Sequence, residues 1–368
     1  MLGSSLIRAG AGLSIAAAIA LSSTPARASC DDGRPINCGH RGTGTSNAQN
    51  PAPENTIPSL LKAGEEGATM VEFDIRITAD GVPVLMHDAT VEETTDGMGC
   101  VSELTLEQLQ ALDAGFGTPA EGQGITAPTL AEVLAQVDLD LNVELKYSGG
   151  GGCPELDRDA FASAVLDVLA EDEVADRWQT ISSFDLGLLE AVRAQDGGVY
   201  LGFLTFLPES APAVVAADLD ALNLEDTAVS AETVAAVRAA GLEVNVWTVD
   251  DPARIAALFD LEVDAIISNE PDRVAERRAE LCPEVQETDG DTGEATGDSD
   301  SGEATGDSDA GEVTGDSDAG DAKSGEADTD TAGQGEAEGC GCAHASSRAP
   351  WWLALALVGL ARRRRRWR

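Results

Sequence analysis

The feature that most constrains the fold is a regular alternation of short apolar runs with helical patterns. The apolar runs are NCGH (37–40), MVEFDI (70–75), LNVEL (141–145), TISSF (180–184), VYLGFL (199–204), ALNL (221–224), EVNVW (243–247) and DAIIS (264–268). Amphipathic segments such as DLGLLEAVRAQ and SAETVAAVRAAG lie between them. Strand followed by helix, repeated about eight times over roughly 250 residues, predicts an α/β fold of the (β/α)8 TIM-barrel type.

One further run, PVLMHD, follows MVEFDI too closely for the helix that a parallel crossover needs. We therefore expect a β-hairpin insertion at the C-terminal mouth of the barrel, after strand 2. If Asp80-Gly81 is a two-residue turn, Ile77 faces Val84 and Asp74 faces His87.

Polar residues at the strand ends should meet at this mouth, where barrel active sites are built. The carboxylates of Glu72, Asp74 and Glu144 suit a hard divalent cation, Mg2+ or Ca2+, rather than zinc. The two histidines suit proton transfer near neutral pH. The two cationic side chains suit an anionic substrate, and arginine can grip phosphate oxygens bidentately. Besides those three carboxylates, the set comprises His40, His87, Arg41, Lys146 and Trp247.

Six motifs in order resemble the glycerophosphodiester phosphodiesterase family. They are GHRG at Gly39, PENT at Pro53, VEFDIRITADGVPVLMHD at Val71, VELK at Val143, SSF at Ser182 and VWTVD at Val246. The resemblance covers about Cys38 to Arg273 and implies a barrel enzyme that hydrolyses glycerophosphodiesters to glycerol 3-phosphate and an alcohol, with a divalent cation.

Carried over by motif, the resemblance implies a role for each residue. Glu72, Asp74 and Glu144 would hold the metal, and His40 and His87 would be the acid–base pair. Arg41 and Lys146 would bind phosphate, whereas Glu54 and Asn55 would support the first loop. Two departures, a longer loop from Thr43 to Ala52 and the pair Asn269-Glu270, bear on the choice of alcohol.

Two other functions stay open at this point. The same barrel and His/Glu/Asp set occur in phospholipase D-like toxins and phosphoinositide lyases, so a lipid lyase that forms a cyclic phosphate is an alternative. The Glu144-x-Lys146 pair favours the hydrolase. The non-enzyme alternative is a calcium-responsive surface spacer or adhesin built on the acidic repeats described next.

Four segments are expected along the chain. Residues 1–28 resemble a secretory signal with cleavage after Ala28; a lipoprotein signal ending at Cys30 and a retained membrane anchor are the alternatives. Residues 29–282 form the barrel domain. Residues 283–339 hold 19 Asp or Glu and nine-residue repeats such as GDSDSGEAT, which indicates a disordered acidic linker rather than a calcium-binding roll. Residues 340–368 combine Cys340 and Cys342, a short apolar run and an arginine cluster.

This C-terminal order resembles the myxobacterial sorting signal, with a retained tail anchor as the alternative. The resemblance implies a processing or sorting protease as a partner, and membrane contact only through this anchor. We therefore expect secretion across the inner membrane to the cell surface or outer membrane, with the periplasm as an alternative. The formal net charge of -43 argues against nucleic acid as a partner.

Secretion favours disulfides over a zinc site for the cysteines. Cys100 follows the hairpin and Cys153 follows the VELK strand, so both lie in mouth loops and are expected to pair. Cys30 and Cys282 flank the barrel and are expected to join its ends. Cys38, inside the first strand, is expected to be buried and free.

Overall fold

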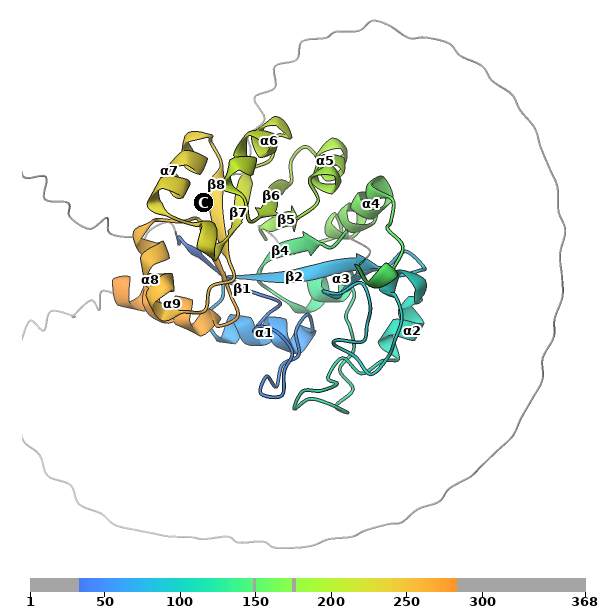
Figure 1. The fold of residues 1–368 in the computed structure, drawn as a ribbon. Coiled ribbons are helices and arrows are strands. Elements are labelled where there is room, and N and C mark those ends of the chain that lie inside the picture. The colour runs from blue at the N-terminus through green and yellow to red at the C-terminus, as the bar shows by residue number, and fades with distance from the viewer. Residues whose placement is uncertain (1–32, 148–149, 174–176, 283–368) are drawn as a thin grey trace, which may run out of the picture. The chain divides into compact units, whose positions relative to one another are not determined.

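A computed structural model describes residues 33–147, 150–173 and 177–282 of the chain, and these form a closed parallel barrel (Figure 1). Eight parallel strands follow one another around it, and pairing of β1 with β2 closes the ring. The predicted TIM barrel is thus confirmed. Its strands are β1 (Ile36–Gly39), β2 (Met70–Ile77), β4 (Asp140–Leu145), β5 (Gln179–Ser183), β6 (Tyr200–Thr205), β7 (Ala221–Glu225), β8 (Glu243–Trp247) and β9 (Ala265–Ser268).

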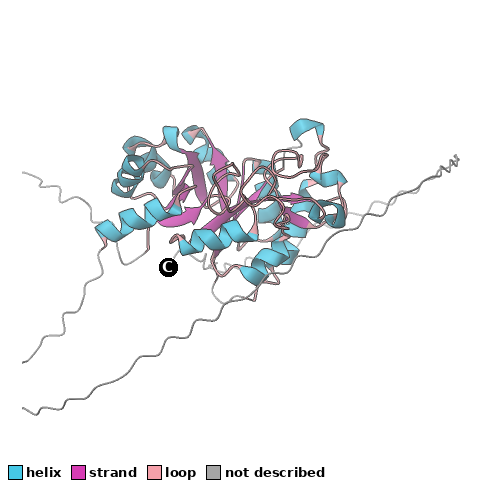
Figure 2. Ribbon diagram, turned by 90° about the horizontal axis from the view of Figure 1, so that it is seen from below, coloured by secondary structure: helices cyan, strands magenta, loops and turns pink. Residues whose placement is uncertain are grey.

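The helices surround the strands, as Figure 2 shows from a second direction. Side chains of Asp157, Asp185, Ser230 and Asp251 accept backbone N–H bonds at four helix starts, so these residues mark where each helix begins. The helices are α1 (Ile57–Glu65), α2 (Leu106–Gln110), α3 (Leu130–Gln136), α4 (Arg158–Leu169), α5 (Leu186–Gln195), α6 (Ala211–Ala216), α7 (Ala231–Ala239), α8 (Pro252–Asp260) and α9 (Pro271–Leu281). Short 3-10 turns are η1 (Val101–Glu103), η2 (Gly150–Gly152), η3 (Pro208–Ser210) and η4 (Asp226–Ala228).

The expected hairpin is present, because β3 (Pro83–Leu85) pairs antiparallel with the end of β2, but its predicted register is wrong by one residue. Arg76, not Ile77, faces Val84. The loop holds three residues rather than two, since Thr78 N–H donates to the carbonyl of Val82 and Gly81 takes a φ of 84°, which glycine adopts readily. The backbone N–H of Met86 therefore donates to the carbonyl of Asp74 (2.9 Å), and His87 lies one residue further on.

Separate apolar clusters pack the barrel and the hairpin. The main one fills the space between the strands and the surrounding helices, with Val71, Phe73 and Ile75 of β2 fully buried. A second cluster lies under the hairpin and packs Val84 and Met86 against Val91, Val101, Leu109 and Ala127. The hairpin is therefore packed against the barrel rather than loose, and its buried residue Met86 directly precedes His87.

The cysteines follow the expected scheme where it falls on described residues. Cys100 and Cys153 form a disulfide, and Cys38 is free and buried. Cys282 is disulfide-bonded, and its expected partner, Cys30, lies outside the described residues. So do the expected signal peptide (1–28), acidic linker (283–339) and C-terminal signal (340–368). Among the described helices, none has the length and apolar character to cross a membrane.

Candidate active site

Strands β2 and β4 bring the three predicted carboxylates together. Asp74 is directly opposite Glu144 in the parallel ladder, and Glu72 is opposite Asn142. Residues two apart on a strand share a face, so Glu72, Asp74 and Glu144 all point to one side. One oxygen from each lies within 4.8 Å of the others, and all three residues are buried.

Burial and crowding hold the carboxylates in different protonation states. Burial and the nearby Asp74 raise the pKa of Glu72 to about 8 and that of Glu144 to about 7. Burial also acts to raise the pKa of Asp74, but Lys146 and Arg41 outweigh it and lower this pKa to about 2. In addition, Oε1 of Glu72 is buried without a hydrogen-bond partner. At neutral pH the raised pKa favours the protonated form of Glu72, whereas Asp74 is ionised.

The His40-Arg41-Gly42 turn closes β1 and aims Arg41 at the carboxylates. Arg41 and Gly42 have φ values of 50° and 89°, and a Cβ on Gly42 would lie 2.3 Å from Oγ of Ser59. The position therefore needs glycine. In this turn the backbone N–H of Arg41 donates to Oε2 of Glu72 (2.9 Å).

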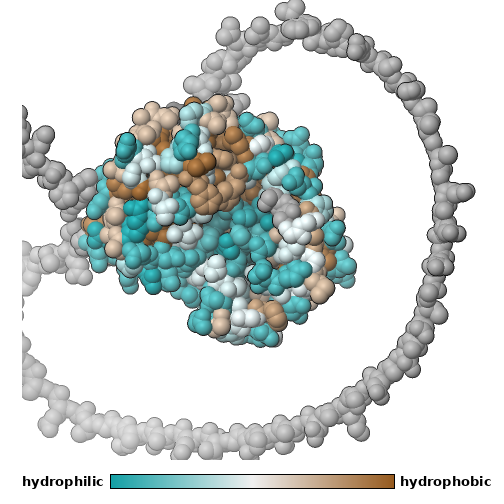
Figure 3. All heavy atoms as spheres, in the orientation of Figure 1, coloured by the Kyte–Doolittle hydropathy of each residue, from teal (hydrophilic) through white to brown (hydrophobic). Residues whose placement is uncertain are grey.

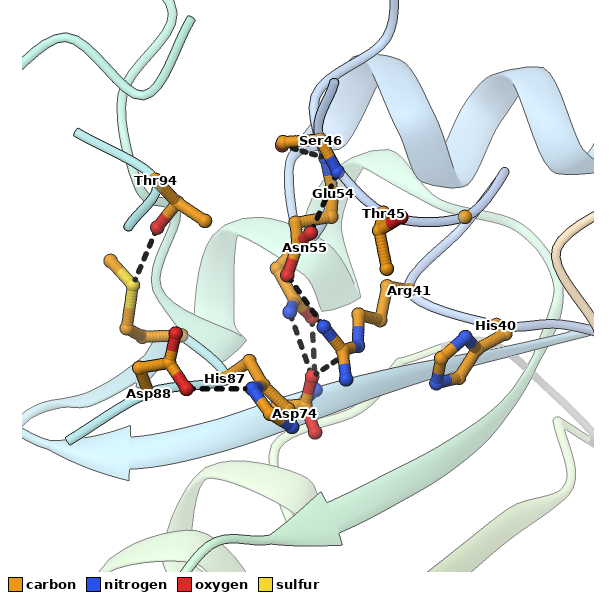
Figure 4. A network of polar contacts seen from close by, with 12 residues as sticks. His40, Arg41, Thr45, Ser46, Glu54, Asn55, Asp74, His87, Asp88 and Thr94 are labelled. Atoms are coloured by element: carbon orange, nitrogen blue, oxygen red, sulfur yellow. Dashed lines mark hydrogen bonds and ion pairs between the residues drawn. The ribbon is translucent and has the colours of Figure 1, made fainter. Parts of the chain in front are cut away.

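The side chain of Arg41 forms ion pairs with two carboxylates. Its guanidinium lies 2.8 Å from Glu54 and 3.3 Å from Asp74 (Figure 4). Glu54 in turn accepts from the backbone N–H of Ser46 (2.7 Å). Asn55 donates from Nδ2 to Asp74 (2.8 Å) and accepts from the Asp74 backbone N–H (3.0 Å). Glu54 and Asn55 thus tie the first mouth loop to β2.

His40 is positioned through a residue at the end of the last strand. Its Nδ1 lies 2.7 Å from Oδ1 of Asn269, and its Nε2 lies 4.0 Å from Oε2 of Glu72. Asn269 is itself fixed, since its Nδ2 donates to Asp250 (2.7 Å). Burial, followed by the charge of Arg41, lowers the pKa of His40, so the ring is neutral at neutral pH.

His87 comes from the hairpin and approaches Asp74 from the other side (Figure 4). Its Nδ1 lies 2.9 Å from Oδ1 of Asp88, and Arg76 holds its backbone carbonyl through Nε and Nη2 (3.0 and 2.7 Å). Burial lowers the pKa of His87, although Asp74 acts in the opposite direction. The His87 side chain is 29% exposed, against 15% for His40, so His87 has better access to solvent.

Lys146 completes the polar part of the site. Its Nζ lies 2.8 Å from Glu144 and 3.5 Å from Asp74. Burial acts to lower the pKa of Lys146, but Asp74 and Glu144 outweigh it and raise this pKa, so the ammonium stays charged. The same Nζ lies 5.6 Å from the ring centroid of Phe184.

Trp247 lies on the apolar side of the mouth. Its ring centroid is 5.3 Å from that of Phe184, and its indole N–H donates to the backbone carbonyl of Asn223 (2.9 Å). The structure therefore links Trp247 to the polar groups through Phe184, which contacts both Trp247 and Lys146.

Sequence reasoning did not assign roles to Asp88, Arg76, Asp250 or Asn269. Asp88 follows His87 directly, so its place in the HD pair was an available signal. In the sequence Asn269 stands out only as a departure from the family pattern, and its link to His40 spans 229 residues. Such a contact depends on the closure of the barrel and leaves no mark in local spacing.

Comparisons with known proteins show the family to which the chain belongs. The model of the glycerophosphoryl diester phosphodiesterase family matches residues 40–273. A glycerophosphodiester phosphodiesterase from Caldanaerobacter subterraneus is 33% identical over 227 residues, which cover 60% of this chain and 90% of that protein. A human protein, glycerophosphodiester phosphodiesterase 1, is 46% identical over 87 residues, 23% of this chain and 26% of its own.

A solved structure of a phosphodiesterase has a similar fold. The fold is similar to that of an Oleispira antarctica phosphodiesterase in complex with the product sn-glycerol-3-phosphate, with a TM-score of 0.59 and 29% identity. That match covers 65% of this chain and 95% of the other. The chain belongs to the glycerophosphoryl diester phosphodiesterase family and is a phosphoric diester hydrolase.

Proposed function

We propose that this enzyme hydrolyses glycerophosphodiesters to glycerol 3-phosphate and an alcohol, with a divalent cation and with His40 and His87 as base and acid. The observation that carries the proposal is the buried group of Glu72, Asp74 and Glu144. A histidine lies on each side of this group. The family and the product-bound relative support the substrate class.

The carboxylate cluster fits a hard cation. Three buried carboxylates supply only oxygen donors, which Ca2+ and Mg2+ prefer. The Oε1 atom of Glu72 is buried without a hydrogen-bond partner and so is available to an ion, and burial, followed by the charge of Asp74, raises the pKa values of Glu72 and Glu144. When bound, such a cation would stabilise negative charge on phosphate oxygens.

The contacts of His40 favour the role of base. The Oδ1 atom of Asn269 can only accept a hydrogen bond, because Asp250 holds its Nδ2. Nδ1 of His40 must then carry the proton, which leaves a lone pair on Nε2 toward the carboxylates. The lowered pKa of His40 keeps that lone pair free. His40 would take the proton of the attacking hydroxyl, whether that of water or of the substrate's own glycerol.

The contacts of His87 favour the role of acid. Burial lowers the pKa of His87, but the carboxylates of Asp74 and Asp88 act in the opposite direction, and that of Asp88 lies against Nδ1, where a carboxylate stabilises an imidazolium better than an amide does. Nε2–H would then donate to the departing alkoxide, and solvent can return the proton because the ring is partly exposed. Lys146 and Arg41, both at the carboxylates, would attract the phosphate.

Release of glycerol 3-phosphate from glycerophosphocholine tests the proposal. The full chain is assayed with Ca2+ and with Mg2+, alongside the variants His87→Ala and Glu72→Gln. His87→Ala should lose at least about a hundredfold in kcat, in line with the usual contribution of one acid–base group. Glu72→Gln removes one of the carboxylates that would hold the cation, so it should lose most of its activity and need more cation for what remains. Glu209→Gln, on the short turn η3, serves as the control. Substantial activity in either site variant would refute this assignment.

We further propose that the enzyme acts outside the cytoplasm. The Cys100–Cys153 disulfide supports this location, because disulfides persist in oxidising compartments. Fractionation of the native host, with an antibody against the barrel, would test it. Surface or periplasmic protein is the expected result, and a purely cytoplasmic pool would contradict the proposal.

A further inference from the structure

Arg76 joins two segments that carry residues of the candidate active site. It lies near the end of β2, two residues after Asp74, and faces Val84 in the hairpin ladder. Its Nε and Nη2 donate to the backbone carbonyl of His87 (3.0 and 2.7 Å), and its Nη1 donates to the backbone carbonyl of Lys146 (3.2 Å). One guanidinium therefore links the hairpin to the end of β4.

The His87 carbonyl lies where the ladder of the hairpin stops. The paired residues of β3 end at Leu85, and the N–H of Met86 makes one more backbone bond to β2 (2.9 Å). His87 follows directly and lies outside the strand. Its contact with Asp88 orients the imidazole ring, whereas the two bonds from Arg76 fix the backbone that carries the ring.

A covalent bond joins the same two segments further along the chain. The Cys100–Cys153 disulfide connects the chain after the hairpin to the chain after β4, and Sγ of Cys153 also contacts the carbonyl of Ala89 (3.4 Å). These contacts hold the two segments together without Arg76. A substitution at Arg76 should therefore keep the fold and change how His87 is placed.

The surroundings of Arg76 fit a role in positioning better than one in substrate binding. A substrate needs open space, such as the hydrophilic hollow near the middle of the face in Figure 3. The space beside Arg76 is a cavity of about 20 Å³ that Lys146, Ala89 and Cys153 also line, with room for about one water. Arginine suits this place, because its planar guanidinium presents several donors in a fixed fork, whereas lysine has a single ammonium.

We propose that Arg76 is a positioning residue: through the carbonyls of His87 and Lys146, its guanidinium holds His87 at a set distance from the carboxylates of β2 and β4. The inference rests on the proposed function, in which Nε2–H of His87 gives its proton to the departing alkoxide. Arg76 acts on the reaction only through the backbone of His87.

The test compares two substrates that differ in their need for an acid. Glycerophosphocholine releases an alkoxide that must gain a proton, whereas glycero-3-phospho-4-nitrophenol releases 4-nitrophenolate, which is stable without one. Both are hydrolysed by the full chain with the activating cation.

Arg76→Lys keeps the positive charge but cannot bridge both carbonyls with the same geometry. Its kcat for glycerophosphocholine should fall by about tenfold, which is part of the contribution of an acid. For the nitrophenyl substrate kcat should stay within about twofold of the wild type, because little acid catalysis is needed there. KM should change little for either substrate. Arg76→Met removes the guanidinium donors and should lower the ratio of the two kcat values further.

Arg177→Lys is the matched control. Arg177 also donates to two backbone carbonyls, those of Leu134 and Val137 (3.3 and 2.7 Å), but it precedes β5 and so lies at the end of the barrel opposite the mouth. This variant should leave the ratio of the two kcat values unchanged. Thermal unfolding checks that every variant is folded.

Three results would overturn the proposal. An equal loss of kcat for both substrates would give Arg76 a general structural role, and an unchanged ratio would show that His87 keeps its position without it. A rise in KM with kcat intact would make Arg76 a substrate ligand.

His87→Ala, assayed with the same two substrates, separates this proposal from the proposed function. If His87→Ala slows glycerophosphocholine selectively and the Arg76 variants do not, only the role of Arg76 fails. If His87→Ala slows both substrates equally, the role of His87 as acid fails, and the role of Arg76 fails with it.

Discussion

Asn269 accepts a hydrogen bond from Nδ1 of His40 at 2.7 Å, across the junction of the first and last strands of the barrel. This contact decides which ring nitrogen of His40 faces the carboxylates.

Replacement of Asn269 should therefore impair catalysis more than folding. Asn269→Leu removes the acceptor, so the neutral ring can take either tautomer and loses its fixed orientation. We expect kcat for glycerophosphocholine to fall by about tenfold or more, within the range that acid–base positioning contributes, while KM changes little. Glu270→Gln, at the neighbouring position, is the control. A change confined to KM would show that Asn269 contacts substrate instead of orienting His40.

The fold and most of the site could be predicted because both depend on local patterns. The apolar runs fix the strands, and the carboxyl ends of parallel strands must meet at one mouth, which brings His40, Glu72, Asp74 and Glu144 together. The hairpin register could not be predicted from Asp80-Gly81 alone. The hydroxyl of Thr78 donates to Asp80 (2.6 Å), and Thr78 N–H closes the loop on Val82, so three residues form the turn.

Contacts between residues that are far apart in the sequence could not be predicted either. Asn269 reaches His40, with Asp250 behind it, only after the barrel has closed, and Phe206 joins Trp247 from a strand two positions away. The sequences around these residues look like ordinary loops. The residues come together only through the tertiary structure.

A divalent cation should stabilise the enzyme more at high pH than at low pH. The folded pKa of Glu72, about 8, lies above its ordinary value of 4.5. For such a group the cation-free fold keeps its full stability below about pH 4.5 and loses stability as pH rises through about 8. The pKa of Asp74 is lowered to about 2. Its contribution to folding stability is therefore lost only as pH falls through that value, far below the pH range in which Glu72 titrates.

The measurement is the melting temperature of cation-stripped protein with and without saturating Ca2+ or Mg2+, at pH 6 and pH 8.5. We expect a larger rise in Tm at pH 8.5, because the carboxylates no longer have to release protons to bind the ion. In Glu72→Gln the dependence on pH should shrink. Equal rises in Tm at the two pH values would contradict the coupling between the cation and Glu72.

The phosphorus-containing product should be glycerol 3-phosphate rather than a persistent cyclic phosphate. Lys146 lies 2.8 Å from Glu144 and 3.5 Å from Asp74, and the Glu144-x-Lys146 pair favours the hydrolase over the lyase. Phosphorus NMR of glycerophosphocholine during turnover distinguishes the two outcomes. A cyclic signal that rises and then disappears indicates attack by the glycerol hydroxyl followed by hydrolysis. A cyclic product that accumulates would make the enzyme a lyase.

Loss of the Cys100–Cys153 disulfide should destabilise the barrel mouth. The bond joins the loop after His87 to the loop after Lys146, and Sγ of Cys153 also contacts the carbonyl of Ala89 (3.4 Å). The sequence separation is 53 residues, for which the loop-entropy relation gives about 4 kcal/mol of unfolding free energy. Equilibrium denaturation of Cys100→Ser, Cys153→Ser and the double variant measures it. Because either substitution breaks the same bond, each single variant should lose nearly as much as the double. Losses that add up across the two single variants would show that packing of each sulfur, rather than the bond between them, supplies the stability.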